Sequence, residues 1–193
     1  KIIRNTIRDI GYNDSYPSFS FEKVKVKLYI DEQSPHIAQG VDAVGDSEQG
    51  AGDQGLMFGY ACNETLELMP LPIQLSQKLT ERLSKVRKEK KLPWLGPDGK
   101  SQVTVEYLDN KPICISKVVI ATQHDDMLDE FKTEEVEHSY IKNAVIEKII
   151  IPVLDECKIK YDTNFIVNGT GRFVLGGPEA DTGLTGRKII VDT

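Results

Sequence analysis

The sequence has few cysteines, no long apolar run and no excess of positive charge. Its three cysteines, Cys62, Cys114 and Cys157, are widely spaced and form no Cys-x-x-Cys pair, which argues against a disulfide framework and a zinc site. No apolar run reaches the roughly 18 residues that a membrane-spanning helix needs. Lys and Arg number 24 against 30 Asp and Glu, and this net charge of −6 argues against a partner that is nucleic acid or an anionic membrane. We therefore expect a soluble cytoplasmic protein whose basic side chains act locally.

Apolar residues recur at helical and strand spacings, which predicts an α+β protein. With 193 residues, of which 39% are apolar, the chain can bury at least one sizeable core. Helices are expected at 2–10, ending at Gly11, after Pro70 and Pro72 with Leu75, Leu79, Leu83 and Val86 buried, and from Thr133 to Pro152 with Val136, Tyr140, Ile141, Val145 and Ile149 buried. Strands are expected at 24–30, 56–62, 164–168 and 188–192, with a turn at 96–100 leading into a hairpin at 101–122. Hairpins and helices are expected to be layered on one face of a sheet.

The segment 31–50 follows neither periodicity. It contains Pro35, Gly40, Gly45 and Gly50. A structureless connection of this length is typically a functional lid or a disordered segment. We interpret it as a lid.

Several charged segments have two interpretations. The run RKEKK at 87–91 is either a phosphate patch or a solvated helix end, and the second is favoured because cations stabilise helix C-termini. The segment HDDMLDE at 124–130 lacks the Gly and final Glu of a calcium loop and is interpreted as a solvated loop. The scattered His36, His124 and His138 are interpreted as surface or supporting residues rather than ligands.

Gly50, Gly52 and Gly55 have the G-x-G-x-x-G spacing of a dinucleotide-binding turn. Such a turn follows a strand, opens a helix and has an acidic residue about 20 positions further on. The segment DAVGDSEQ that precedes these glycines has no strand character, and no Asp or Glu occurs between Glu67 and Glu81. The residues alone leave a tight turn or another nucleotide site as the alternatives.

Four segments of the chain together resemble one family of enzymes. They are GAGDQGLMFGYA at 50–61, LPWLGPDGKSQVT at 92–104, NGTGRFV at 168–174 and GGPEADTGLTGRKIIVDT at 176–193. In sequence, order and approximate spacing they resemble S-adenosylmethionine synthetase (methionine adenosyltransferase). Gly169 stands where many members of that family have Pro.

The resemblance implies an α+β architecture of two-layer α/β units that are repeated and intertwined. The chain is then expected to be an internal fragment, with the end of an N-terminal domain at 1–30, a flexible gating loop at 31–50, the central domain at 51–167 and the start of a C-terminal domain at 168–193. The resemblance also implies a homodimer or homotetramer with active sites between subunits.

The resemblance further implies a reaction and its residues. The sulfur of L-methionine attacks C5′ of ATP, and the released tripolyphosphate is hydrolysed to phosphate and diphosphate. Lys100, Arg187 and Lys188 are expected to hold the phosphates and to be catalytic. The nucleotide is expected to contact Asp53, Asp98, Gly99, Arg172, Phe173 and Asp181, with Phe173 stacked on adenine. Methionine is expected to contact Gln33, at the start of the gating loop, and Asp181.

The metal ligands of that family are not found in this sequence. A His-Pro-Asp-Lys motif, a GGGAFSGKD-type segment and the acidic potassium ligand are all absent. Two Mg²⁺ ions per site and one K⁺ are therefore expected to have their ligands outside this chain. Two hypotheses follow: the chain is the central part of a complete, active enzyme, or it is a stand-alone nucleotide or polyphosphate binder, or a dimerising scaffold, without turnover. In either case the chain alone is expected to be inactive.

Overall fold

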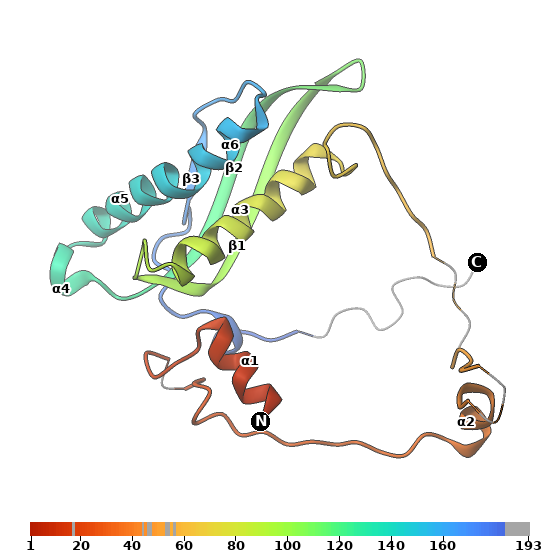
Figure 1. Cartoon of the computed structure of the whole chain (residues 1–193). Coiled ribbons are helices and arrows are strands. Elements are labelled where there is room, and N and C mark those ends of the chain that lie inside the picture. Colours follow the sequence, from red (N-terminus) through yellow and green to blue (C-terminus); the bar gives the residue numbers. More distant parts are fainter. Residues whose placement is uncertain (17, 44, 46–47, 53–54, 56, 184–193) are drawn as a thin grey trace. The chain divides into compact units, whose positions relative to one another are not determined.

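The computed structural model describes residues 1–193 except 17, 44, 46–47, 53–54, 56 and 184–193 (Figure 1). These residues divide into two units. The larger consists of Lys1–Lys23 and Tyr60–Thr182, and the smaller takes in Val24–Gly59. The predicted strand at 188–192 lies outside the described residues.

A three-stranded sheet forms the centre of the larger unit. Strands β1 (Leu95–Leu108) and β2 (Lys111–His124) are antiparallel, and β3 (Phe165–Val167) pairs in parallel with β2, giving the order β1-β2-β3. Asp109 and Asn110 both have left-handed backbones, with φ of 49° and 58°, which suits the tight turn of a twisted hairpin. The predicted hairpin and the predicted strand at 164–168 are confirmed.

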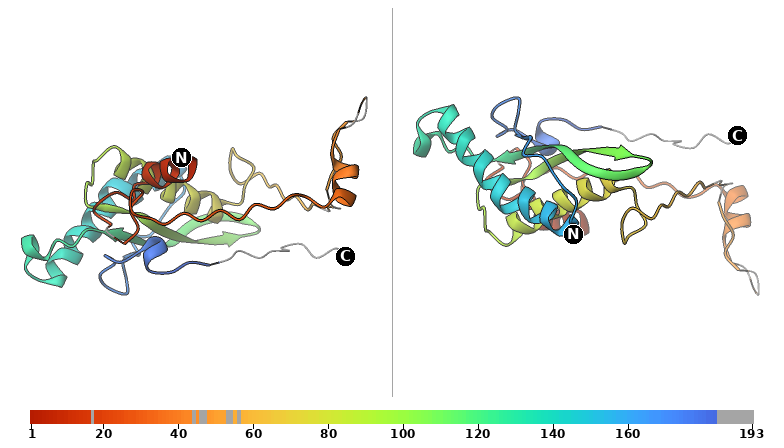
Figure 2. Two further views of the ribbon diagram at one scale, coloured as in Figure 1. Left: turned by 90° about the horizontal axis from the view of Figure 1, so that it is seen from below. Right: turned by 90° about the horizontal axis from the view of Figure 1, so that it is seen from above.

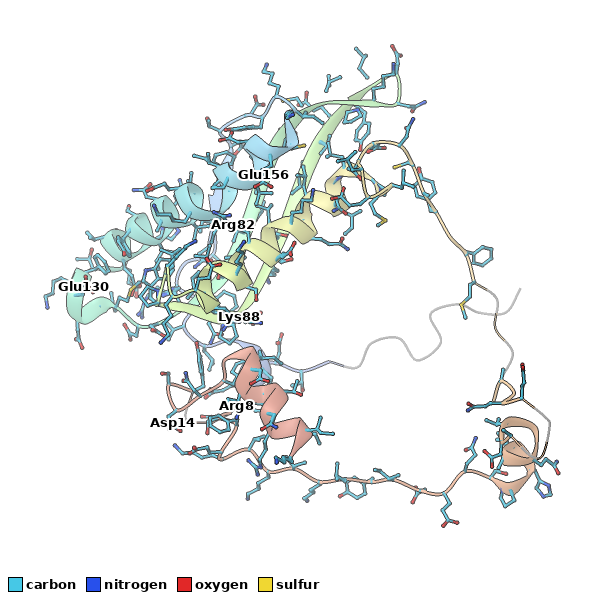
Figure 3. The ribbon with its side chains drawn as sticks, viewed as in Figure 1. Arg8, Asp14, Arg82, Lys88, Glu130 and Glu156 are labelled. Carbon is cyan, nitrogen blue, oxygen red and sulfur yellow. The ribbon has the colours of Figure 1, made fainter. Side chains whose placement is uncertain are left out.

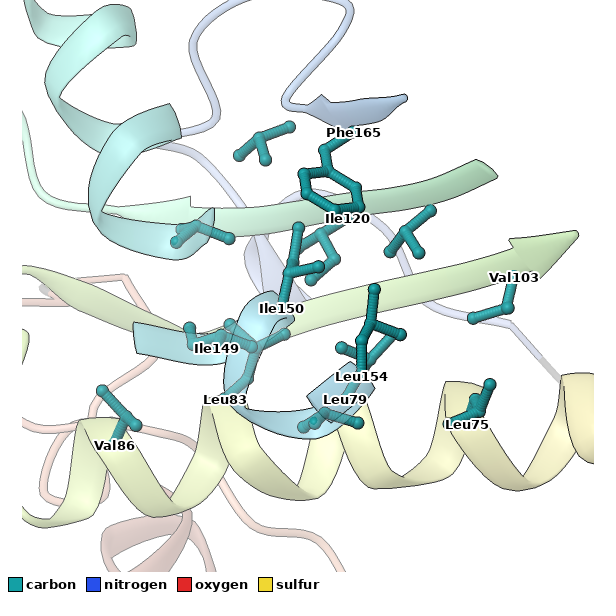
Figure 4. Close-up of a cluster of buried hydrophobic side chains, with 14 of the residues drawn as sticks. Leu75, Leu79, Leu83, Val86, Val103, Ile120, Ile149, Ile150, Leu154 and Phe165 are labelled. Carbon is teal, nitrogen blue, oxygen red and sulfur yellow. The ribbon is translucent and has the colours of Figure 1, made fainter. Parts of the chain in front are cut away.

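Two helical segments cover one face of this sheet (Figure 2). The first is α3 (Leu71–Lys88), and the second runs through α5 (Glu134–Val145), a π-helical stretch (Ile146–Ile150) and α6 (Ile151–Cys157). Their apolar stripes meet the inner side chains of the strands in a single core (Figure 4). The members of this core with no exposed surface are Leu79, Ile115, Val118, Ile120, Val145, Ile149, Ile150 and Leu154.

The apolar stripe predicted for α3 is confirmed, because Leu75, Leu79, Leu83 and Val86 are all buried. The cap at Thr133 is confirmed as well, since its side chain accepts a hydrogen bond from Val136 N at 3.4 Å. Of the second stripe, Ile141, Val145 and Ile149 are buried, whereas Val136 and Tyr140 are 51% and 42% exposed, contrary to the prediction.

Pro152 does not end the helix, contrary to the prediction. The helix continues to Cys157 by way of the π-helical turn Ile146–Ile150, which ends two residues before the proline. Proline has no N–H and its ring obstructs the carbonyl of the preceding turn, so a wider turn accommodates it without breaking the helix.

Three predicted elements are corrected. Residues 24–30 and the described part of 56–62 are not strands, and Tyr29, Ile30 and Phe58 are 86%, 85% and 74% exposed. A strand requires a hydrogen-bonded neighbour, and the sheet of the described residues includes neither segment. Residues 96–100 do not form a turn, because they lie in the irregular start of β1, where the register shifts between Leu95 and Gly99.

The remaining helices are short. In the larger unit, α1 (Ile2–Ile10) ends as predicted at Gly11, whose φ is 118°, and α4 (Leu128–Phe131) and a 3₁₀ turn (Gly177–Glu179) are single turns. In the smaller unit, α2 (Pro35–Val41) gives the supposedly structureless segment 31–50 a helix, which begins with Pro35 in its first turn, a position suited to proline. None of the helices in the described part of the chain is long and apolar enough to cross a membrane.

Candidate functional site

The start of β1 and the segment after β3 meet at the end of β2, and Gln123 joins them. Its Oε1 accepts a hydrogen bond from Asp98 N at 3.3 Å, and its Nε2 donates to Val174 O at 3.0 Å. A Cβ at Gly96 would lie 2.6 to 2.8 Å from side-chain carbons of Gln123, so the strand reaches this position only with glycine. The Oδ2 of Asp98 accepts from Gly177 N at 2.8 Å, which ties the GPDGK and GGPEAD segments directly together.

His124 fixes the backbone of Phe173. The N–H of His124 donates to Phe173 O, and Nε2 of its ring accepts from Phe173 N, both at 3.0 Å. Because Nε2 is the acceptor, the neutral ring carries its proton on Nδ1. This nitrogen donates to the backbone carbonyl oxygen of Asp125 at 2.8 Å. His124 is buried and sets the position from which the Phe173 ring projects.

Asn168 anchors the start of the same segment. Its Oδ1 accepts from Thr122 N at 2.8 Å and its Nδ2 donates to Thr122 O at 3.1 Å. The backbone pairing of β2 with β3 ends at Ile120 and Val167, and these two side-chain bonds continue the hydrogen bonding one step further along β2. Asn168 has a φ of 45°, a left-handed conformation that Asn tolerates better than most residues.

Two carboxylates hold the guanidinium of Arg172. Its Nε donates to Oε2 of Glu137 at 2.7 Å, and its Nη2 donates to Oδ1 of Asp126 at 2.5 Å. Glu137 has no exposed surface, and its Oε1 also accepts from Met127 N at 2.8 Å. Burial alone would raise the pKa of Glu137, but the hydrogen bonds from Arg172 and Met127 outweigh it and hold that pKa below its ordinary value of 4.5. The backbone N–H of Leu128, followed by Arg172, lowers the pKa of Asp126.

This buried ion pair predicts a loss of stability in acid. The pKa of Glu137 is depressed by folding, so its contribution to stability is complete above pH 4.5 and is lost as the pH falls through its value in the folded protein. We expect the urea concentration at the unfolding midpoint to decrease as the pH is lowered from about 5 to about 3. Glu137→Gln is expected to be less stable at pH 7 and to lose less over the same range. Parallel pH profiles for the two proteins would contradict the assignment.

Six of the predicted site residues lie in the larger unit, on segments that contact one another. Asp98, Gly99 and Lys100 lie on β1, Arg172 and Phe173 lie after β3, and Asp181 follows the 3₁₀ turn, where its N–H donates to Gly177 O at 3.2 Å. A Cβ at Gly99 would face Leu83 of α3, so the side chain of Lys100 lies on the opposite face of the sheet. Asp53, Arg187 and Lys188 lie outside the described residues.

The hollow bordered by Asp98 and Gly99 lies between β1 and α3, because Leu83, Ser84 and Arg87 of α3 also line it. It is therefore on the face of the sheet opposite to the side chain of Lys100, and with a volume of about 50 Å³ it is smaller than the roughly 300 Å³ usual for small-ligand pockets. Within the described residues, no three His, Cys, Asp or Glu side chains are grouped as a metal site would require. The donor set of this part of the chain therefore does not fit a metal ion.

Gln33 belongs to the smaller unit, just before α2, and is exposed. No residue of α2 is buried, and Ile37 is 44% exposed, so this helix has no buried apolar stripe.

We expect a glutamate-specific protease to cut the complete protein first after Glu32, and ATP with methionine to slow that cut as the lid closes. Equal rates with and without substrates would count against a lid.

The sequence did not single out Gln123, Glu137 or Asn168 as parts of the site. The residues at 124–130 predict a solvated loop, but His124 is 2% exposed and Asp126 is paired with Arg172. A detectable signal existed only for Glu137, an acidic residue at a helical position otherwise facing the core. The partners of the other two depend on contacts far apart in the chain.

These elements define an α+β domain in which separate glycine-containing segments meet beside one end of a sheet. Residues 48–173 match the family model for the central domain of S-adenosylmethionine synthetase. The chain belongs to the S-adenosylmethionine synthetase family, as its four sequence segments predicted.

Proposed function

We propose that the protein carrying this chain transfers the adenosyl group of ATP to L-methionine. In this reaction the methionine sulfur attacks C5′ of ATP and tripolyphosphate leaves, to be hydrolysed to phosphate and diphosphate. The observation that carries the proposal is the contact between the two glycine-containing segments through Asp98 and Gly177, in a chain of this family.

The chemistry suits the residue types in and near the site. A thioether sulfur is a neutral nucleophile and needs no general base, so catalysis rests on aligning the reactants and stabilising a departing polyanion. In the proposed site Lys100, with Arg187 and Lys188, contacts the phosphates, because cations in loops rich in glycine can approach them closely. Asp53, Asp98 and Asp181 contact adenosine, and Gln33 and Asp181 contact methionine.

Arg172 and Phe173 act as a preset pair in this proposal. Glu137 and Asp126 engage Nε and Nη2 of Arg172, and Nη1 makes no hydrogen bond to any described residue, so it can donate to the nucleotide. His124 holds the backbone of Phe173, whose ring then stacks on adenine. Because the guanidinium of Arg172 and the backbone of Phe173 are held before the nucleotide arrives, less conformational entropy is lost on binding.

The complete site is proposed to form between subunits of a homodimer or homotetramer. The highly exposed apolar side chains of Tyr29, Ile30 and Phe58 support this. Two Mg²⁺ and one K⁺ would be held by residues outside this chain and would neutralise phosphate charge.

The test is an assay of the complete protein with ATP and labelled methionine. We expect S-adenosylmethionine, phosphate and diphosphate in equal amounts. Binding of ATP without any adenosyl transfer would instead support a nucleotide-binding protein without turnover.

A further inference from the structure

A second hollow, of about 370 Å³, lies between the C-terminal end of α3 and the segment that follows α1. Its cationic lining consists of Arg8, Arg87, Lys88 and Lys90. Figure 3 labels two of these side chains, Arg8 on α1 and Lys88 at the end of α3. The whole chain carries a net charge of −6, so this local excess of positive charge runs against the average composition.

Arg87 is the innermost of these cations. Its guanidinium packs against Gly11, where a Cβ would overlap it, and the left-handed φ of 118° also favours glycine at that position. Burial lowers the pKa of Arg87 below its ordinary value. Within the described residues, this half-buried guanidinium has no hydrogen bond or ion pair. A partly desolvated charge without a counter-ion is costly, and an anion in the hollow would compensate it.

The other groups that line the hollow are mainly donors. Lys88 and Lys90 form no ion pair with the described part of the chain, and Arg8 pairs only with the exposed Asp9, at 3.1 Å. Burial, followed by the charge of Asp125, raises the pKa of Tyr16 to about 12, so its hydroxyl keeps its proton and can donate. Asp125 is the one carboxylate among the residues that line the hollow.

We propose that this hollow binds a diphosphate group, either as a free anion or as part of a nucleotide. Several cations and a phenol around a concave surface match a small anion with multiple charges, and Arg87 offers a planar fork that suits phosphate oxygens. The hollow reaches the size usual for small-ligand pockets. The sequence favours a solvated helix end for the segment RKEKK. In this proposal the segment also contributes to an anion site, because Arg87 turns inward while Lys88 and Lys90 stay exposed.

The test is calorimetric titration of the complete protein with pyrophosphate, without divalent metal and at low salt. Every protein in this titration, including the reference, also carries Lys100→Ala, which weakens binding at the proposed substrate site. We expect Arg87→Gln to weaken binding about tenfold or more, since it removes a charge-assisted contact. Lys85→Gln makes the same charge change in the last turns of the same helix, but Lys85 does not line this hollow, so it is expected to change the affinity less than about twofold.

A double lysine variant and a titration with ADP complete the test. Lys88→Gln with Lys90→Gln changes only exposed side chains, so it tests the hollow even if Arg87→Gln disturbs folding, and it is expected to weaken binding severalfold. Arg87-dependent binding of pyrophosphate but not of ADP would identify the free anion, whereas dependence for both would extend the site to nucleotides. Unchanged pyrophosphate affinity in both the Arg87 variant and the double lysine variant would overturn the proposal.

Discussion

No S-adenosylmethionine is expected when the 193-residue chain alone is incubated with ATP and radiolabelled methionine. The chain keeps Lys100 and Arg172, but it has no His-Pro-Asp-Lys motif and no GGGAFSGKD-type segment, and its described part groups no metal ligands. Stabilisation of a leaving polyphosphate is shared between protein cations and bound metal ions. Losing the proposed metal ions would therefore remove several kcal/mol of transition-state stabilisation at once, which would put turnover below detection.

The control for this experiment is the complete protein under the same conditions, with the mass of each polypeptide verified. We expect the chain alone to show at most weak, salt-sensitive binding of polyphosphate. It is also expected to associate, because Leu28, Tyr29 and Ile30 expose large apolar surfaces. Steady turnover by a verified 193-residue polypeptide would show that the missing motifs are dispensable.

Lys188→Ala in the complete protein is expected to lower kcat by about 10²-fold or more. Negative charge accumulates on the leaving phosphates in the transition state, and a positioned ammonium group stabilises that charge more than it stabilises bound ATP. Lys188 lies outside the described residues, so the expectation rests on its place in the GRKIIVD segment. The affinity for methionine alone is expected to change little, because that substrate carries no phosphate.

Lys111→Ala is the matched control, since Lys111 is an exposed lysine at the hairpin end of β2. It is expected to keep kcat within about twofold, as surface substitutions away from a site usually do. A near-normal kcat for Lys188→Ala would remove this lysine from the polyphosphate site. Equal losses in both variants would point to a general effect on stability instead.

Much of the larger unit could be predicted from local patterns. The leucine stripe of α3, the Thr133 cap and the hairpin are confirmed, because each depends on residues within a few positions of one another. The failed strand predictions concern elements whose state depends on distant partners. Alternation at 24–30 predicts a strand, but a strand exists only beside another strand. Pro152 predicts a helix end, but the π-helical turn before it allows the helix to continue.

The site was predictable only in part, for the same reason. Resemblance to a family predicts Asp98, Arg172 and Phe173 as site residues, and the structure brings the segments that carry them together. It could not identify Glu137, which lies 35 positions from Arg172 and is recognisable only once the helix and the segment after β3 are in contact. His124 was similarly grouped with scattered histidines, although its ring fixes Phe173.

The most direct measurement is a structure of the complete protein with methionine and a non-hydrolysable ATP analogue. We expect adenine to stack on the ring of Phe173, the phosphates to lie near Lys100, and Arg172 to keep its bonds to Glu137 while contacting the nucleotide. An analogue bound elsewhere, with Phe173 and Arg172 free of contact, would contradict the proposed site.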